Sequence, residues 1–284
     1  FMADIGLALL AMFAILRQGS PDGITARIGR IPSTALMCAI VLCIGPMLAI
    51  PRTAATTYET SLAPLVSGFS PALFSILFFL LILLLCVRET AVVDIVGKIL
   101  TPALLIGLLI LIVVGVVNPI GPVGEQSLVE NVAATGVEAG YQTMDAIAGL
   151  NFGIVIVLNI RALGVTQERP ILRTTIRAGV IAAILFAVVY SMLAHIGALS
   201  STAFPGTTNG AVTLTNVVGA IFGPVGSVLL AAVFIIACFN TCVGLFSCCG
   251  EYFAGIFPKI GYRGWVFVFA FVSMVISNVG LDMI

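Results

Sequence analysis

The sequence contains 284 residues, of which 61% are apolar and only 8% are charged, whereas soluble proteins average about half and a quarter. The formal net charge is zero, which excludes the global basic field of a nucleic-acid-binding protein. The seven cysteines lie inside apolar runs without a histidine at zinc-finger spacing, which excludes a secreted disulfide framework and argues against a zinc module. The composition predicts a membrane protein.

Eight apolar runs, bounded by Gly, Pro and charged residues, predict eight transmembrane helices. These runs do not alternate apolar and polar residues as the strands of a membrane β-barrel would. We therefore expect an all-helical, polytopic membrane protein with one membrane domain over residues 1–284. The predicted spans lie near 3–16, 34–50, 71–87, 99–117, 143–160, 177–197, 224–249 and 264–281.

The connections between the predicted spans alternate in charge. One set, at 17–33, 88–98, 161–177 and 251–263, holds eleven of the twelve basic residues, and the other set holds only Arg52. By the positive-inside rule the first set faces the cytoplasm. The eleven are Arg17, Arg27, Arg30, Arg88, Lys98, Arg161, Arg169, Arg173, Arg177, Lys259 and Arg263.

Two features concern the ends and the outer connections. The chain begins at Phe1 without a basic segment ahead of a cleavage site, so we expect a fragment of a longer chain without a signal peptide. The uncharged connection at 198–223 is long and ends at Pro224, which favours a folded cap over a tight turn. A passive surface loop is an equally good interpretation.

The first interruption of the apolar pattern is CIGPMLAIPRTAATTYE, at 43–59. Proline inside a helix removes a hydrogen bond and bends the axis, so Pro46 and Pro51 predict a break ahead of Arg52. Arg52 would then face an anionic group or pair with Glu59. The alternative is that the span ends at Pro51 and the charges lie in water.

The second interruption is GYQTMDAIAGLNFGIVI, at 140–156. Gly149 and Gly153 flank Asn151 in the middle of a span, and each Gly lowers helix stability by roughly 1 kcal/mol. Broken helices at this depth expose backbone groups to substrate in transporters, which favours a binding segment. Close helix packing by small residues is the alternative.

The third interruption is the pair Asn240 and Thr241 near the centre of the span at 224–249. Small cations prefer oxygen ligands, so these two side chains, together with the carbonyl of Ala237, could form half of a cation site. A threonine hydroxyl bonded to its own helix is the common alternative. The neighbouring cysteines are better explained as small packing residues.

Together these three segments resemble the branched-chain amino acid:cation symporter family (LIVCS). The similarity covers essentially the whole sequence in the same order. It implies a relative of the LeuT-type transporters, with two inverted five-helix repeats, in which the eight predicted spans correspond to the second to ninth helices. The first helix of the family, which contributes to substrate and sodium binding, has no counterpart in these residues.

The resemblance also implies a set of binding residues. Asn240 and Thr241 would match the sodium-ligating pair of the eighth helix, with Asn240 standing where the family more usually has a hydroxyl residue. No organic cofactor and no catalytic residue is expected. The expected metal ligands are Ala237, Asn240 and Thr241, and the expected substrate-binding residues are Gly45, Pro46, Arg52, Thr53, Gly149, Asn151, Phe152 and Gly153.

The sequence thus favours a carrier in a bacterial inner membrane that imports Leu, Ile or Val with sodium. An alternative is a LeuT-type carrier for another amino acid coupled to protons, with Asp145 or His195 as the titrating group. An intramembrane enzyme is disfavoured because no Ser–His pair, HExxH motif or pair of Asp residues at two span centres occurs. An inactive remnant is the third possibility.

Overall fold

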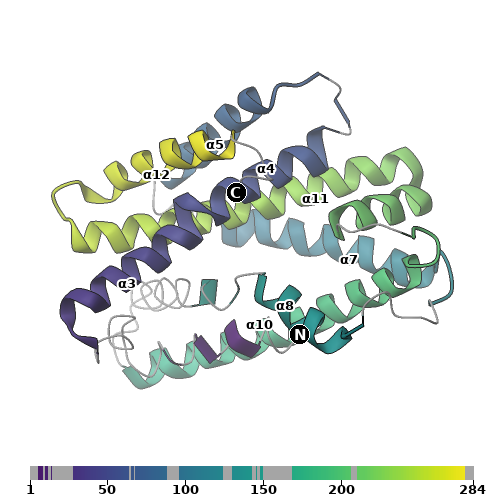
Figure 1. Cartoon of the computed structure of the whole chain (residues 1–284), viewed down its shortest axis with the longest axis horizontal. Coiled ribbons are helices and arrows are strands. Elements are labelled where there is room, and N and C mark those ends of the chain that lie inside the picture. The colour runs from purple at the N-terminus through teal and green to yellow at the C-terminus, as the bar shows by residue number, and fades with distance from the viewer. Residues whose placement is uncertain are drawn as a thin grey trace. The chain divides into compact units, whose positions relative to one another are not determined.

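The computed structural model describes most of the chain as helix (Figure 1). It describes residues 28–63, 65–66, 68–87, 96–123, 130–142, 168–205 and 210–278, with nine further positions at 6–8, 10, 11, 14, 145, 148 and 149. All regular elements in these ranges are helices, so the all-helical prediction is confirmed for them. The elements are α3 (Arg30–Leu42), η3 (Cys43–Met47), α4 (Ala49–Thr57), η4 (Tyr58–Leu62), α5 (Pro71–Cys86), η5 (Val96–Leu100), α7 (Thr101–Val117), α8 (Val132–Gln142), α10 (Glu168–Ser200), α11 (Gly210–Ile256) and α12 (Gly261–Ser277), where η denotes a π-helical turn.

Four helical segments of the described residues are long and apolar enough to cross a membrane, and two shorter apolar helices accompany them. The six overlap six of the predicted spans, but Arg30–Leu62 and Val212–Ile256 are much longer than the predicted spans at 34–50 and 224–249. The predicted spans at 3–16 and 143–160 lie mostly outside the described residues. The four long segments are Arg30–Leu62, Gly97–Val117, Ile176–Ser200 and Val212–Ile256, and the shorter ones are Pro71–Cys86 and Gly261–Ser277.

The chain divides into two compact units. Unit 1 comprises Phe1–Ile44 and Ser127–Tyr190, and unit 2 comprises Gly45–Gln126 and Ser191–Ile284. The expectation of a single membrane domain concerns how all the helices assemble in the bilayer, and it stays a prediction.

Within unit 2, α11 is the central helix, and α4, η4, α5, α7 and α12 all pack against it (Figure 1). The buried core between α5 and α11 includes Phe79 and Phe246, whose rings meet edge to face at 6.2 Å. A second core cluster joins α7 to both halves of α11 through Leu111, Val218, Leu230 and Val233. Apolar packing against these neighbouring elements, together with apolar side chains such as Val225 and Val228 on the exposed face, accounts for the almost continuously hydrophobic sequence of α11.

The outer faces of the same helices are also apolar. Leu84 of α5 and Ile106 of α7 are 62% and 60% exposed, respectively. Exposed leucine and isoleucine on this scale would be costly in water, but lipid tails are as apolar as these side chains. The exposed faces of these helices are therefore suited to contact lipid, and the buried faces pack against neighbouring helices.

A sharp break divides α11 at Gly223, whose φ of 62° lies in the left-handed region that glycine tolerates. Pro224 follows and begins the second, longer segment at the residue where the predicted span starts. The predicted outer connection at 198–223 contains the end of α10 and the first segment of α11. The described part of that stretch is thus largely helical, and its role as a cap stays a prediction.

Candidate functional site

The helix break at Gly45 and Pro46 lies in unit 2. Gly45 departs from helical geometry, with φ −95° and ψ −118°, and Pro46 has no N–H to donate. The hydroxyl of Ser273 on α12 donates to the Pro46 carbonyl at 3.2 Å, and Ser273 is fully buried. Ser273, which is far from Pro46 in the sequence, therefore provides a hydrogen bond to the backbone at the point where the helix is broken.

Gly45 also lies directly against α11. A Cβ atom at this position would overlap the Sγ atom of Cys249. The absence of a side chain at residue 45 thus lets the broken segment approach α11 closely.

The predicted break at Pro51 is wrong, because the helix passes through this residue, while the alternative that the membrane span ends there stays a prediction. Pro51 lies in the first turn of α4, where a backbone N–H has no helical acceptor in any case, so the ring is tolerated. Helical structure continues through η4 to Leu62. The interruption belongs to Gly45 and Pro46 alone.

Arg52 and Thr53 follow on α4. Arg52 is exposed. Thr53 is half-buried, and its hydroxyl donates to the Ala49 carbonyl at 2.7 Å, while Thr57 donates to the Thr53 carbonyl at 2.6 Å. The Thr53 hydroxyl thus donates its proton within the helix, and only its oxygen lone pairs could accept a hydrogen bond or coordinate a ligand.

The third segment lies on α11. Thr241 is exposed, and its hydroxyl donates to the Ala237 carbonyl at 3.0 Å, which is the local pattern expected of membrane threonines. The two oxygens are therefore adjacent. Asn240 turns instead towards α7, where its amide nitrogen lies 3.4 Å from the hydroxyl of Thr101. Its buried Oδ1 has no hydrogen-bond partner among the described residues.

The second segment is described only in part. Gly149 is helical, and a Cβ atom there would lie 2.7 Å from the carbonyl oxygen of Ala8, so the two backbones touch within unit 1. This contact is what close packing by small residues requires. Asn151, Phe152 and Gly153 lie outside the described residues, and the broken-helix hypothesis for them stays a prediction.

The structure brings two of the three segments onto neighbouring helices of unit 2. The Gly45 break contacts α11 at Cys249, eight residues and about 12 Å along the helix from Thr241. The sequence interpretation missed Ser273 and Cys249 as partners of the break. The available signal was Ser273, a polar residue in the middle of the apolar run at 264–281.

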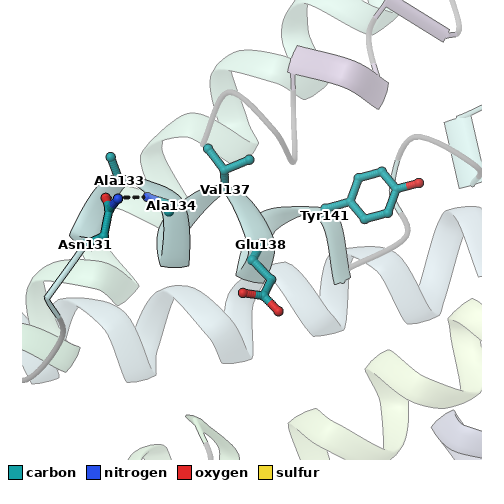
Figure 2. A pocket seen from close by; sticks show the side chains of 6 residues that line it. All are labelled: Asn131, Ala133, Ala134, Val137, Glu138 and Tyr141. Carbon is teal, nitrogen blue, oxygen red and sulfur yellow. Dashed lines mark hydrogen bonds between the residues drawn. The ribbon is translucent and has the colours of Figure 1, made fainter.

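A separate surface hollow of about 610 Å³ follows α8 (Figure 2). Asn131 caps this helix, since its side-chain oxygen accepts the Ala134 N–H at 3.1 Å, and Val137 and Glu138 point to opposite sides. Val137 and Tyr141 are 61% and 68% exposed. The hollow is open and has no converging polar groups, so it is not the substrate site that we favour.

These features define a polytopic, all-helical membrane protein with helices broken inside its apolar spans. The chain belongs to the branched-chain amino acid transport protein family, whose model matches residues 1–284. This is a family of transporters and not of enzymes, which confirms the prediction that the protein is not an enzyme.

The curated relatives that the chain matches are also named as branched-chain amino acid permeases or carriers. The chain is 36% identical over 298 residues to the branched-chain amino acid permease BrnQ of Lactobacillus delbrueckii subsp. lactis, covering 100% of the chain and 66% of the relative. It is 38% identical over 285 residues to the branched-chain amino acid transport system 2 carrier protein of Pseudomonas aeruginosa, covering 99% and 65%. It is 36% identical over 283 residues to BrnQ of Escherichia coli K12, covering 98% and 64%.

The chain therefore spans a little under two thirds of the length of these relatives. No solved structure matches it.

Proposed function

We propose that this protein carries leucine, isoleucine and valine into the cell together with sodium. The observation that carries the proposal is the family match over all 284 residues, supported by relatives named as branched-chain amino acid carriers. The protein would reside in a bacterial inner membrane with the basic connections at 17–33, 88–98, 161–177 and 251–263 in the cytoplasm. Its eight spans would form part of a LeuT-type inverted-repeat fold.

The substrate needs two kinds of surface. Its charged ends need backbone groups or an ion, and its aliphatic side chain needs an apolar recess, whose burial contributes roughly 1.5–3 kcal/mol. The break at Gly45 and Pro46 supplies irregular backbone beside α11, and Arg52 and Thr53 continue the same element. Gly149, Asn151, Phe152 and Gly153 would supply the corresponding surface from the other interrupted span.

Sodium would be bound by oxygens of α11. The Ala237 carbonyl and the Thr241 hydroxyl already lie together, and rotation of the hydroxyl proton away from the carbonyl would present both oxygens to a cation. The side-chain oxygen of Asn240 is the third expected ligand. This oxygen has no hydrogen-bond partner among the described residues, but the side chain turns towards Thr101 of α7, so ligation beside Thr241 would require another rotamer of Asn240.

One cation per amino acid supplies enough energy for accumulation. A single positive charge moving through about 100 mV releases roughly 2.3 kcal/mol, whereas tenfold accumulation needs about 1.4 kcal/mol. A coupled carrier of this kind would therefore sustain gradients of tens of fold.

The test is uptake of radiolabelled leucine into proteoliposomes that contain the full-length protein carrying this sequence. We expect an inward sodium gradient to drive uptake, with isoleucine and valine competing and glutamate and lysine not. A potassium gradient of the same size is the control. Uptake that follows a proton gradient without sodium would overturn sodium coupling, and the absence of leucine exchange in any ion would overturn the carrier function.

The sodium ligands allow a sharper prediction. Thr241→Val keeps the shape of the side chain and removes one oxygen, so the sodium concentration for half-maximal uptake should rise about tenfold or more, since a bond to a charged group is worth about 1.5–3 kcal/mol. The maximal rate at saturating sodium should change much less. Sodium titration of leucine uptake measures both quantities.

Thr34→Val is the matched control. Thr34 is a half-buried helical threonine whose hydroxyl donates to the Arg30 carbonyl at 3.0 Å, the same hydrogen-bond geometry as Thr241. This variant should leave the sodium dependence unchanged. Equal shifts in both variants, or no shift in Thr241→Val, would contradict the assignment of Thr241 as a ligand.

A further inference from the structure

A small cavity of about 190 Å³ lies in unit 2 where η4 and the turn that follows it meet α11 at the Gly223 break. Four of its lining residues carry hydroxyl groups and none carries a charge. Apolar side chains complete the lining. The residues are Thr60, Ser61, Leu65, Thr215, Pro224, Ser227 and Leu230.

Ser61 is the unusual member of this lining. Its side chain is fully buried, and its hydroxyl has no hydrogen-bond partner in the part of the chain that the structure describes. A buried donor that is left unpaired destabilises the folded protein. A ligand in the cavity that accepts this hydrogen bond would remove that destabilisation.

The break in α11 gives one wall of the cavity a positive character. Pro224 begins the second segment of α11, and the first-turn N–H groups that follow it have no partner within their own helix. Gly226 has no side chain, which lets the Val218 carbonyl of the first segment come close; a Cβ atom at residue 226 would lie 2.7 Å from that oxygen. The positive end of a long helix thus reaches the cavity through Pro224 and Ser227.

The end of η4 gives the part of the lining formed by Thr60 and Ser61 a negative character. The helical stretch after the Gly45 break, formed by α4 and η4, ends at Leu62 beside the cavity, and Thr60 and Ser61 belong to its last turn. The C-terminal end of a helix carries a partial negative charge and favours cations. A lone cation would be disfavoured at Pro224 and a lone anion at Leu62, whereas a group with both charges matches both parts of the lining.

We propose that this cavity is an outer docking site for the α-carboxylate and α-ammonium groups of an aliphatic amino acid. The carboxylate accepts hydrogen bonds from Ser61 and from the start of the Pro224 helix, and the ammonium group lies at the end of η4. The aliphatic side chain packs on Leu65 and Leu230. The cavity holds about six water volumes, enough for the charged end and part of the side chain.

This inference rests on the proposed function, because it concerns the same substrate on its way in. In the predicted topology the connections after η4 and before Pro224 face away from the basic cytoplasmic connections. The cavity would therefore meet external substrate first. The proposed role of the cavity is to bind external leucine before transport. Loss of this binding should raise KM for leucine and leave the maximal rate unchanged.

The first test uses Ser61→Ala in the full-length protein reconstituted in proteoliposomes. We expect KM for external leucine to rise about tenfold at an unchanged maximal rate, because one donor to the carboxylate is lost. Ser200→Ala is the control, since Ser200 is also buried but donates to the Gly197 carbonyl at 2.8 Å. If Ser61→Ala does not fold, Ser227→Ala, at a half-buried position, takes its place with the same expectation.

The second test does not require transport. Thr60→Cys places a thiol in the lining, and its reaction with a membrane-impermeant thiol reagent is followed in the reconstituted protein against the wild-type background. Leucine should slow the reaction at least severalfold, whereas leucinol, which lacks the carboxylate, and sodium chloride alone should not. The exposed Ser201→Cys should react at the same rate with and without leucine.

The experiments distinguish failure of the docking-site proposal from failure of the proposed carrier function. If wild-type protein takes up leucine but Thr60→Cys is not protected, or KM in the hydroxyl-deletion variant is unchanged, the docking site is overturned and the carrier function stands. Equal protection by leucinol or by chloride alone would also overturn it, because the carboxylate would not be recognised. If wild-type protein takes up no leucine, the proposed function itself fails.

Discussion

Replacing Gly45 by alanine should destabilise the protein by about 1–3 kcal/mol, because the added Cβ atom would overlap the Sγ atom of Cys249. Cys249 is fully buried and has little space to move. At about 2–4 °C per kcal/mol, the midpoint of thermal unfolding should fall by several degrees. Thermal unfolding in detergent, followed with a thiol-reactive dye that reports exposure of the buried cysteines, measures the change.

Two variants control this experiment. Gly197→Ala adds the same atom to a helical glycine of α10 with no neighbour within 4 Å, so the midpoint should stay or rise slightly. In a Cys249→Ala background, Gly45→Ala should cost much less than in the wild-type, since the overlapping sulfur is gone. Equal costs in both backgrounds would show that Gly45 is not needed for contact with Cys249.

Phe253→Ala should be the most damaging single truncation among the residues considered, with a cost of about 3–5 kcal/mol. Phe253 is 5% exposed and joins α11 to α12 through ring contacts with Trp265 at 4.9 Å and Phe269 at 5.2 Å. The rings of Tyr252 and Phe257 lie at 5.8 and 6.3 Å. The same thermal assay should show a fall of roughly 10 °C, at about 2–4 °C per kcal/mol.

Phe271→Ala provides the comparison. Phe271 is on α12 near the same cluster in sequence, but it is 64% exposed on the outer face. Its loss should change the midpoint little, because its lipid or detergent contacts are replaced by similar ones. A similar fall in both variants would mean that the aromatic cluster does not hold α12 on α11.

The binding segments divide into parts that local sequence predicts and parts that it does not. The break at Pro46 follows from a proline's missing donor, and the start of a helix at Pro224 follows from the same chemistry, so both were predictable. The continuation of α4 past Pro51 was not, because whether a proline ends a helix depends on where the helix begins. The orientation of Asn240 towards Thr101 depends on which helix lies next to α11.

The sequence by itself determined that this protein is helical, lies in a membrane and belongs to a family of amino acid carriers. Long apolar runs have few stable alternatives in lipid, where each backbone group must be bonded within its own segment. Only the tertiary structure decided that Cys249 packs against Gly45, that Ser273 bonds to the Pro46 carbonyl, and that Ser61 lies buried beside Pro224. These partners are far apart along the chain and meet through shape and hydrogen bonding between helices, which no local pattern of apolar residues encodes.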